Sequence, residues 1–94
     1  MAICRIIETG ATPEQYDQVR ERVGVGPDNP PPGGRVHIAA QGEDGKIRVI
    51  EVWDSREQAE QWTEQKVRPS RQAVAPDVGE PTITYYDVHQ MMVT

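Results

Sequence analysis

The residue of this sequence best suited to acid–base chemistry is His37, in the stretch RVHIAAQ at positions 35–41. A histidine changes charge near neutral pH, so it can take a proton from a phenol or an acidic C–H group. The stretch alternates as a β-strand does, which puts His37 on the opposite face from Val36 and Ile38. Two interpretations follow: a general base in a ligand site, or a buried histidine satisfied by a backbone or carboxylate partner.

Glu51 and Trp53 form a second pair of candidates, because residues two apart on a strand share a face. A carboxylate desolvated beside an indole has a raised pKa, which suits a general acid or a group that orients His37. Trp53 and Trp62 offer flat apolar surface to an aromatic ligand. The structural alternative places Trp53 in the core and pairs Glu51 with an arginine such as Arg5.

Tyr85, Asp87 and His89 share one face of the final predicted strand, at positions 82–93. A tyrosine hydroxyl and an imidazole within reach of each other could hold a ligand oxygen, so Tyr85 and His89 are substrate-binding candidates. The alternative is a strand end that meets water or another subunit.

Metal and nucleotide sites are not indicated. Two histidines and scattered carboxylates show no His-x-x-x-His or Cys-x-x-Cys spacing, so we expect no metal. The Gly24-Val25-Gly26 stretch follows a predicted helix, which is the wrong context for dinucleotide binding. Cys4 lies within a predicted strand and is expected to be buried rather than nucleophilic. We therefore expect no cofactor.

The elements that must position these residues follow in the order β, α, β, β, α, β. Strands are predicted at 2–8, 35–41, 46–53 and 82–93, and helices begin at the capping boxes TPEQ (12–15) and SREQ (55–58). Gly24 should end the first helix, and Pro69 should interrupt the second, with a further short turn over 70–74. The segment GVGPDNPPPGG at 24–34 excludes regular structure and is either a lid over a site or a stiff linker.

This order predicts a single α+β domain over residues 1–94, a ferredoxin-like antiparallel sheet with two helices on one face. The chain is only 36% hydrophobic and has no Phe, so its own core is thin. The uncovered sheet face still carries apolar residues. We therefore expect a homodimer in which two sheets pair face to face as a dimeric α/β barrel.

The charge balance argues against polyanionic partners. The net charge is −5 and the arginines are scattered among acidic residues, so neither nucleic acid nor an anionic membrane is an expected partner. One cysteine excludes an intrachain disulfide, and no signal peptide or spanning segment is visible. A cytoplasmic location is expected.

Three stretches, EVWDSREQAEQW (51–62), PGGRVHIAA (32–40) and YYDVHQ (85–90), resemble the antibiotic biosynthesis monooxygenase-like family of dimeric α/β barrels. The resemblance implies a pocket between sheet and helices in each subunit. Some members oxidise polycyclic phenols with dioxygen and no bound cofactor, and others degrade haem or isomerise or cyclise small molecules. Haem-degrading members carry an Asn on the first strand, a Trp and a His on the second helix; only Trp53 matches, so haem is not expected.

The leading functional hypothesis is a cofactor-independent, monooxygenase-like enzyme for an aromatic or polyketide-type phenol, with His37 as base aided by Glu51. A second keeps the pocket but isomerises or cyclises the substrate without oxygen. A third is a non-catalytic binding or assembly protein whose sheet serves only to dimerise.

Overall fold

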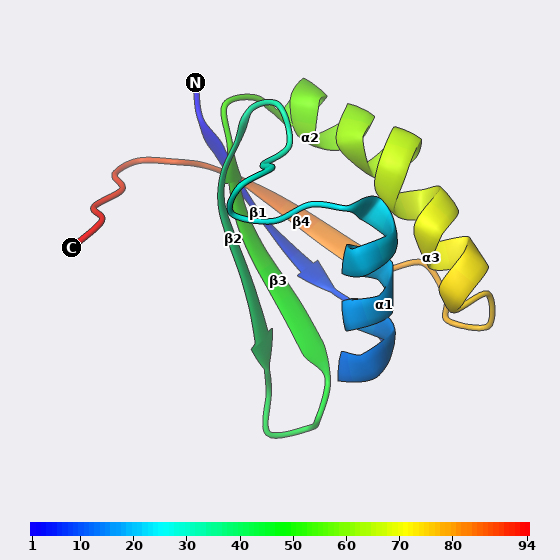
Figure 1. Ribbon diagram of the computed structural model, residues 1–94. Coiled ribbons are helices and arrows are strands. Elements are labelled where there is room, and N and C mark those ends of the chain that lie inside the picture. The colour runs from blue at the N-terminus through cyan, green and yellow to red at the C-terminus, as the bar shows by residue number, and fades with distance from the viewer.

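The sheet is built from four short strands rich in β-branched residues, with all helices on one of its faces (Figure 1). The computed structural model describes all 94 residues. In chain order the elements are β1 (Ile3–Glu8), α1 (Pro13–Val23), β2 (Gly34–Gln41), β3 (Ile47–Trp53), α2 (Arg56–Trp62), the π-helical turn η1 (Thr63–Val67), α3 (Arg68–Val74) and β4 (Thr82–Asp87). The strand order is β2-β3-β1-β4 with antiparallel neighbours. The predicted ferredoxin-like βαββαβ fold is thus confirmed.

The strand register decides which side chains share a face. Arg5 pairs with Glu51 on β3 and with Tyr85 on β4, and Glu51 pairs with His37 on β2. Because paired residues point to the same side of a sheet, all four side chains lie on the face that the helices cover. The other face carries mainly apolar, incompletely buried residues: Cys4, Ile6, Ile38, Ile50 and Tyr86.

Helix α1 begins and ends as its sequence predicts. Thr12 accepts a hydrogen bond from the backbone of Gln15, whose side chain accepts one from Thr12 in return, and Pro13 opens the first turn. Gly24 ends the helix at a φ of 80°, a left-handed conformation that glycine adopts without a Cβ clash. No residue of α1 is fully buried, because the helix lies over a cavity rather than flat on the sheet.

The second helical segment continues past Pro69, so the predicted interruption is wrong. Turn η1 joins α2 to α3, and the Arg68 amide donates to the Thr63 carbonyl five residues back. This wider turn resets the hydrogen-bond register just before the proline. Pro69 then occupies the first turn of α3, where its missing N–H costs no helical hydrogen bond.

Strand β4 is shorter than predicted, because it ends at Asp87 rather than Val93. Its only neighbour in the sheet is β1, which begins at Ile3, and the last backbone bond across the pair joins Val88 to Ala2. Residues beyond Val88 therefore have no strand beside them, and His89 lies outside the sheet. No helix combines the length and apolar character that crossing a membrane would require.

Candidate active site

A cavity of about 620 Å³ lies between the helix-covered face of the sheet, helix α1 and the second helical segment. Its volume falls in the range of small-molecule binding sites. Most of its lining surface is apolar, and aliphatic side chains contribute to it from Ile7, Val19, Val23, Val49, Val67 and Ile83. The few polar side chains of the sheet face, among them His37 and Glu51, therefore border a mainly apolar cavity. Such a cavity suits a largely apolar ligand that is oriented by a few polar contacts.

The proline- and glycine-rich segment 24–34 forms part of this cavity's wall, through residues including Val25, Pro27 and Pro30. The segment is held by contacts of its own. Gly26 and Asn29 exchange backbone hydrogen bonds, and the Asn29 side chain donates to the Gly24 carbonyl at 3.0 Å. Residues 24–33 have no regular element beyond that one bridge, as predicted, whereas Gly34 already begins β2. The segment is folded onto the cavity.

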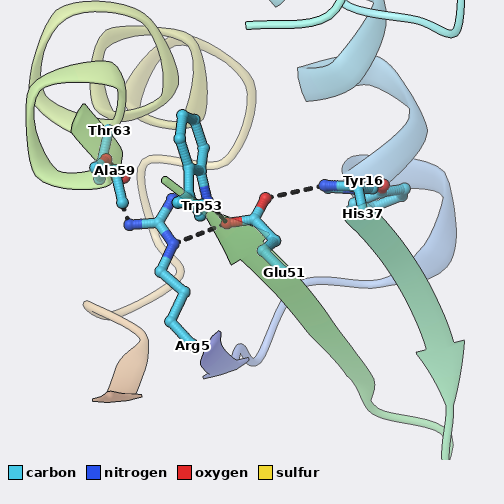
Figure 2. Close-up of polar contacts among 7 residues, drawn as sticks. All are labelled: Arg5, Tyr16, His37, Glu51, Trp53, Ala59 and Thr63. Atoms are coloured by element: carbon cyan, nitrogen blue, oxygen red, sulfur yellow. Dashed lines mark hydrogen bonds and ion pairs between the residues drawn. The ribbon is translucent and has the colours of Figure 1, made fainter. Parts of the chain in front are cut away.

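Three side chains on three elements form one hydrogen-bonded relay (Figure 2). The Tyr16 hydroxyl of α1 lies 2.5 Å from Nε2 of His37 on β2. The other ring nitrogen of His37, Nδ1, lies 2.8 Å from Oε2 of Glu51 on β3. The relay runs from the cavity wall into the buried centre of the sheet face.

Glu51 is the buried anchor of the relay. Its other oxygen, Oε1, accepts hydrogen bonds from Arg5 Nε at 2.6 Å and from Trp53 Nε1 at 3.0 Å. Burial acts to raise the pKa of this carboxyl group, but the His37 hydrogen bond, the Arg5 charge and the indole outweigh it and hold the pKa at about 2. The expected rise in pKa is therefore wrong: Glu51 is ionised at neutral pH and suits the orienting role, not that of an acid.

The ionised carboxylate determines which nitrogen of His37 carries the proton. A carboxylate only accepts hydrogen bonds, so Nδ1 must donate to Glu51. In the neutral ring Nε2 then keeps its lone pair, and the Tyr16 hydroxyl donates to it. The sequence left open whether His37 is a general base or a buried histidine satisfied by a partner. The structure gives it a carboxylate partner, but its side chain is 45% exposed and so is not buried.

Tyr16 is the site residue that sequence reasoning missed, because it counted only as one member of an apolar stripe on a helix. Burial raises the pKa of its phenol, Glu51 raises it further, and Arg20 acts in the opposite direction. Tyr16 is therefore a neutral donor at physiological pH. The one available signal was a hydroxyl in a stripe otherwise made of valines.

Arg5 and Trp53 build the floor beneath Glu51, and both are 1% exposed. The Arg5 guanidinium also donates to the Ala59 carbonyl at 3.3 Å and lies 5.4 Å from the centre of the Trp53 ring. The purely structural roles that the sequence also allowed for Glu51 and Trp53 are therefore observed. Trp53 packs in the core with Ile3 and Ala59, and Glu51 pairs with Arg5. Trp53 still borders the cavity, with its indole N–H on Glu51.

The remaining candidates separate into two groups. Trp62 is half-buried and lines the cavity together with His37, Glu51 and Trp53. Tyr85 does not line it; its ring packs against the core, with the Arg56 guanidinium 4.0 Å from the ring centre. His89 is exposed and also lies outside the cavity lining. No group of three or more His, Cys, Asp or Glu side chains is arranged to hold a metal ion.

Known structures of the same shape were found by comparison of folds. Two of them are named "putative antibiotic biosynthesis monooxygenase". The one from Chloroflexus aurantiacus is 21% identical, with a TM-score of 0.67 over 100% of both chains. The one from Caulobacter crescentus is 17% identical, with a TM-score of 0.68 over 95% of this chain and 91% of that one. The chain has the fold of the antibiotic biosynthesis monooxygenase-like proteins.

A further structure of this fold is SnoaB, a cofactor-independent oxygenase from Streptomyces nogalater. It is 13% identical, with a TM-score of 0.63 over 97% of this chain and 94% of SnoaB. No protein-family model and no curated protein sequence matches the chain. The relationship is therefore one of antibiotic biosynthesis monooxygenase-like fold, and the chemistry has to be argued from the site.

Proposed function

We propose that the protein is a cofactor-independent enzyme that oxidises an aromatic or polyketide-type phenol, with His37 as general base. The observation that carries this proposal is the Tyr16–His37–Glu51 relay, which brings a histidine lone pair to the wall of an apolar cavity. The position now occupied by the Tyr16 hydroxyl is where a substrate hydroxyl would be deprotonated. Trp53 and Trp62 border the space for its rings.

In the proposed reaction Nε2 of His37 takes the phenolic proton, and the ionised Glu51 stabilises the imidazolium that forms. The electron-rich substrate anion then gives two electrons to dioxygen as a C–O bond forms at the ring carbon opposite the oxyanion, and His37 returns its proton to the resulting peroxide. The remaining C–H bond of that carbon supplies the other two electrons when the O–O bond breaks: one oxygen atom stays in the product as a carbonyl, and the other leaves as water. The cavity holds the anion and dioxygen together in a water-poor space.

The test is oxygen uptake by the purified, metal-free protein with an anthrone-type substrate, followed with ¹⁸O₂. We expect ¹⁸O in the product and a fall in kcat of about 10²- to 10⁴-fold in His37→Ala, the usual contribution of a positioned base. The control variant His89→Ala removes the other histidine, which lies outside the cavity lining, and should keep the wild-type rate. Undiminished turnover in His37→Ala would exclude His37 as the base.

The same relay also supports base-catalysed isomerisation or cyclisation, in which no oxygen is consumed. Conversion of the substrate at an undiminished rate under argon would favour that chemistry over oxidation. Binding of the substrate without conversion in either atmosphere would favour a non-catalytic binding protein.

We also propose that a second copy of the chain covers the helix-free face of the sheet. Only 12 of the 94 residues are buried in the single chain, which is a small core for a domain of this length. Ile38 and Tyr86 on the uncovered face remain 50% and 53% exposed. Burying this face against its own copy would remove contiguous apolar surface from water, as in the dimeric α/β barrel.

A further inference from the structure

Arg20 lies on α1 one helical turn after Tyr16 and lines the same cavity. Residues four apart on a helix are neighbours on its surface, so the guanidinium and the Tyr16 hydroxyl belong to one region of the wall. The Arg20 charge acts on the Tyr16 phenol strongly enough to oppose the rise of its pKa. A charged donor group is therefore placed on the wall of the same cavity as the position proposed for the substrate hydroxyl.

Arg20 differs from the other arginines of the cavity wall in having no partner. Arg5 pairs with Glu51, Arg35 with Asp54 at 2.7 Å, and Arg71 with Glu80 at 2.8 Å. No ion pair or hydrogen bond of the Arg20 side chain is present. Because a guanidinium matches a carboxylate through two parallel N–H···O bonds, an unpaired one at a ligand cavity is suited to bind an anion.

The charge distribution of the protein favours anion binding at Arg20 over other positions in the cavity. With a net charge of −5, the chain as a whole repels anions, and the carboxylates paired with Arg35 and Arg71 neutralise those two cations locally. Attraction for a small anion within the cavity is therefore concentrated at Arg20.

We propose that Arg20 binds a carboxylate of the ligand, so that the preferred substrate is a hydroxyaryl carboxylic acid with its hydroxyl at His37. The placement of the substrate hydroxyl at His37 rests on the proposed function. The carboxylate site does not, because it depends only on Arg20 and the cavity. It adds a second point of recognition on the same helix as Tyr16.

The experiment compares the affinities of 6-hydroxy-2-naphthoate and its methyl ester by isothermal titration calorimetry under argon, so that no oxidation occurs. Wild-type protein should bind the acid about 10- to 100-fold more tightly than the ester, the range for a hydrogen bond to a charged group. Arg20→Gln should reduce this preference to less than about threefold, and Arg20→Lys should keep part of it. The preference should also fall with added salt, because the side chain is exposed.

The matched control is Arg22→Gln, which removes an exposed and equally unpaired arginine of α1 that does not line the cavity. It should keep the full preference for the acid. Equal binding of acid and ester by wild-type protein, no binding of either, or the same loss in Arg22→Gln as in Arg20→Gln would overturn the proposal. Selective binding of the acid without any oxygen uptake on anthrone-type substrates would support the Arg20 site and count against the oxygenase function alone.

Discussion

At the scale of single residues, the site depends on one carboxylate that accepts hydrogen bonds from three side chains. Glu51 receives hydrogen bonds from Arg5, Trp53 and His37, and its side chain is only 9% exposed. A buried carboxylate would ordinarily become neutral, but these donors stabilise its charged form more than burial destabilises it. This ionised acid then keeps the proton of His37 on Nδ1 and leaves Nε2 free to accept one.

Glu51 should make stability depend on pH. Its pKa in the folded protein is about 2, against an ordinary value of 4.5, so its stabilisation is complete above pH about 4.5 and is lost as pH falls towards 2. The shift corresponds to about 3 kcal/mol. We expect the free energy of unfolding of Glu51→Gln to be about 3 kcal/mol below wild type at pH 7, and the gap to narrow at pH 3, measured by urea denaturation.

The control for this series is Glu43→Gln, an exposed carboxylate of the hairpin turn that makes no ion pair. Its free energy of unfolding should follow that of wild type at every pH. A gap between Glu51→Gln and wild type that is the same at pH 7 and pH 3 would show that the charge of Glu51 is not what stabilises the fold.

Tyr16 should compete with a phenolic ligand for Nε2 of His37, because both donate to the same lone pair. Removing the hydroxyl in Tyr16→Phe should lower the dissociation constant for 2-naphthol about two- to tenfold, the net contribution of one hydrogen bond. Calorimetric titration measures this directly. Tyr86→Phe, on the opposite face of the sheet, is the matched control and should bind as wild type does. Weaker binding in Tyr16→Phe would mean that the hydroxyl contacts the ligand instead of competing with it.

At the scale of elements, the cavity lies between the helix-covered face of the sheet, helix α1 with segment 24–34, and the second helical segment, whose last helix α3 packs against α1 (Figure 1). Segment 24–34 returns to the sheet at Gly33, whose φ is 84° and whose carbonyl accepts the Asp54 amide at 2.8 Å. A Cβ on Gly33 would lie 2.5 Å from the Gln58 side chain at the start of α2. Gly33 therefore fixes how this wall of the cavity joins β2.

Gly33→Ala should be destabilising, by about 1–2 kcal/mol for the left-handed backbone alone, with the Gln58 contact adding to the loss. Urea denaturation measures the effect. Gly79→Ala is the matched control, because that position has an ordinary φ and open space around a new Cβ. A Gly33→Ala protein as stable as Gly79→Ala would show that segment 24–34 joins the sheet in another conformation.

At the scale of the whole molecule, the sheet has one face covered by its own helices and one left bare. The bare face carries no member of the relay, so catalysis and association would use opposite sides of the same strands. On this proposal, residues at alternating positions along β2 and β3 would serve either the cavity or the subunit contact.

Association should be lost when a charge is placed on the bare face. Wild-type protein at micromolar concentration should sediment at twice the chain mass of 10.5 kDa. Ile38→Asp should sediment as a monomer, because the new carboxylate would be buried unpaired in the interface. Gln18→Asp, on an exposed position of α1, should remain dimeric. A wild-type monomer under these conditions would refute the dimer.

The sequence by itself determined the kind and order of the elements, because capping boxes, alternation and the glycine that ends α1 act over a few neighbouring residues. It also singled out His37, Glu51 and Trp53, since polar and aromatic residues inside β-branched strands stand out locally. Only the tertiary structure decided that Tyr16 meets His37 across 21 positions, that Tyr85 and His89 lie away from the cavity, and that Pro69 fits within a helix. Such outcomes depend on strand register and on where a helix lies over a sheet, which are set by packing between distant segments.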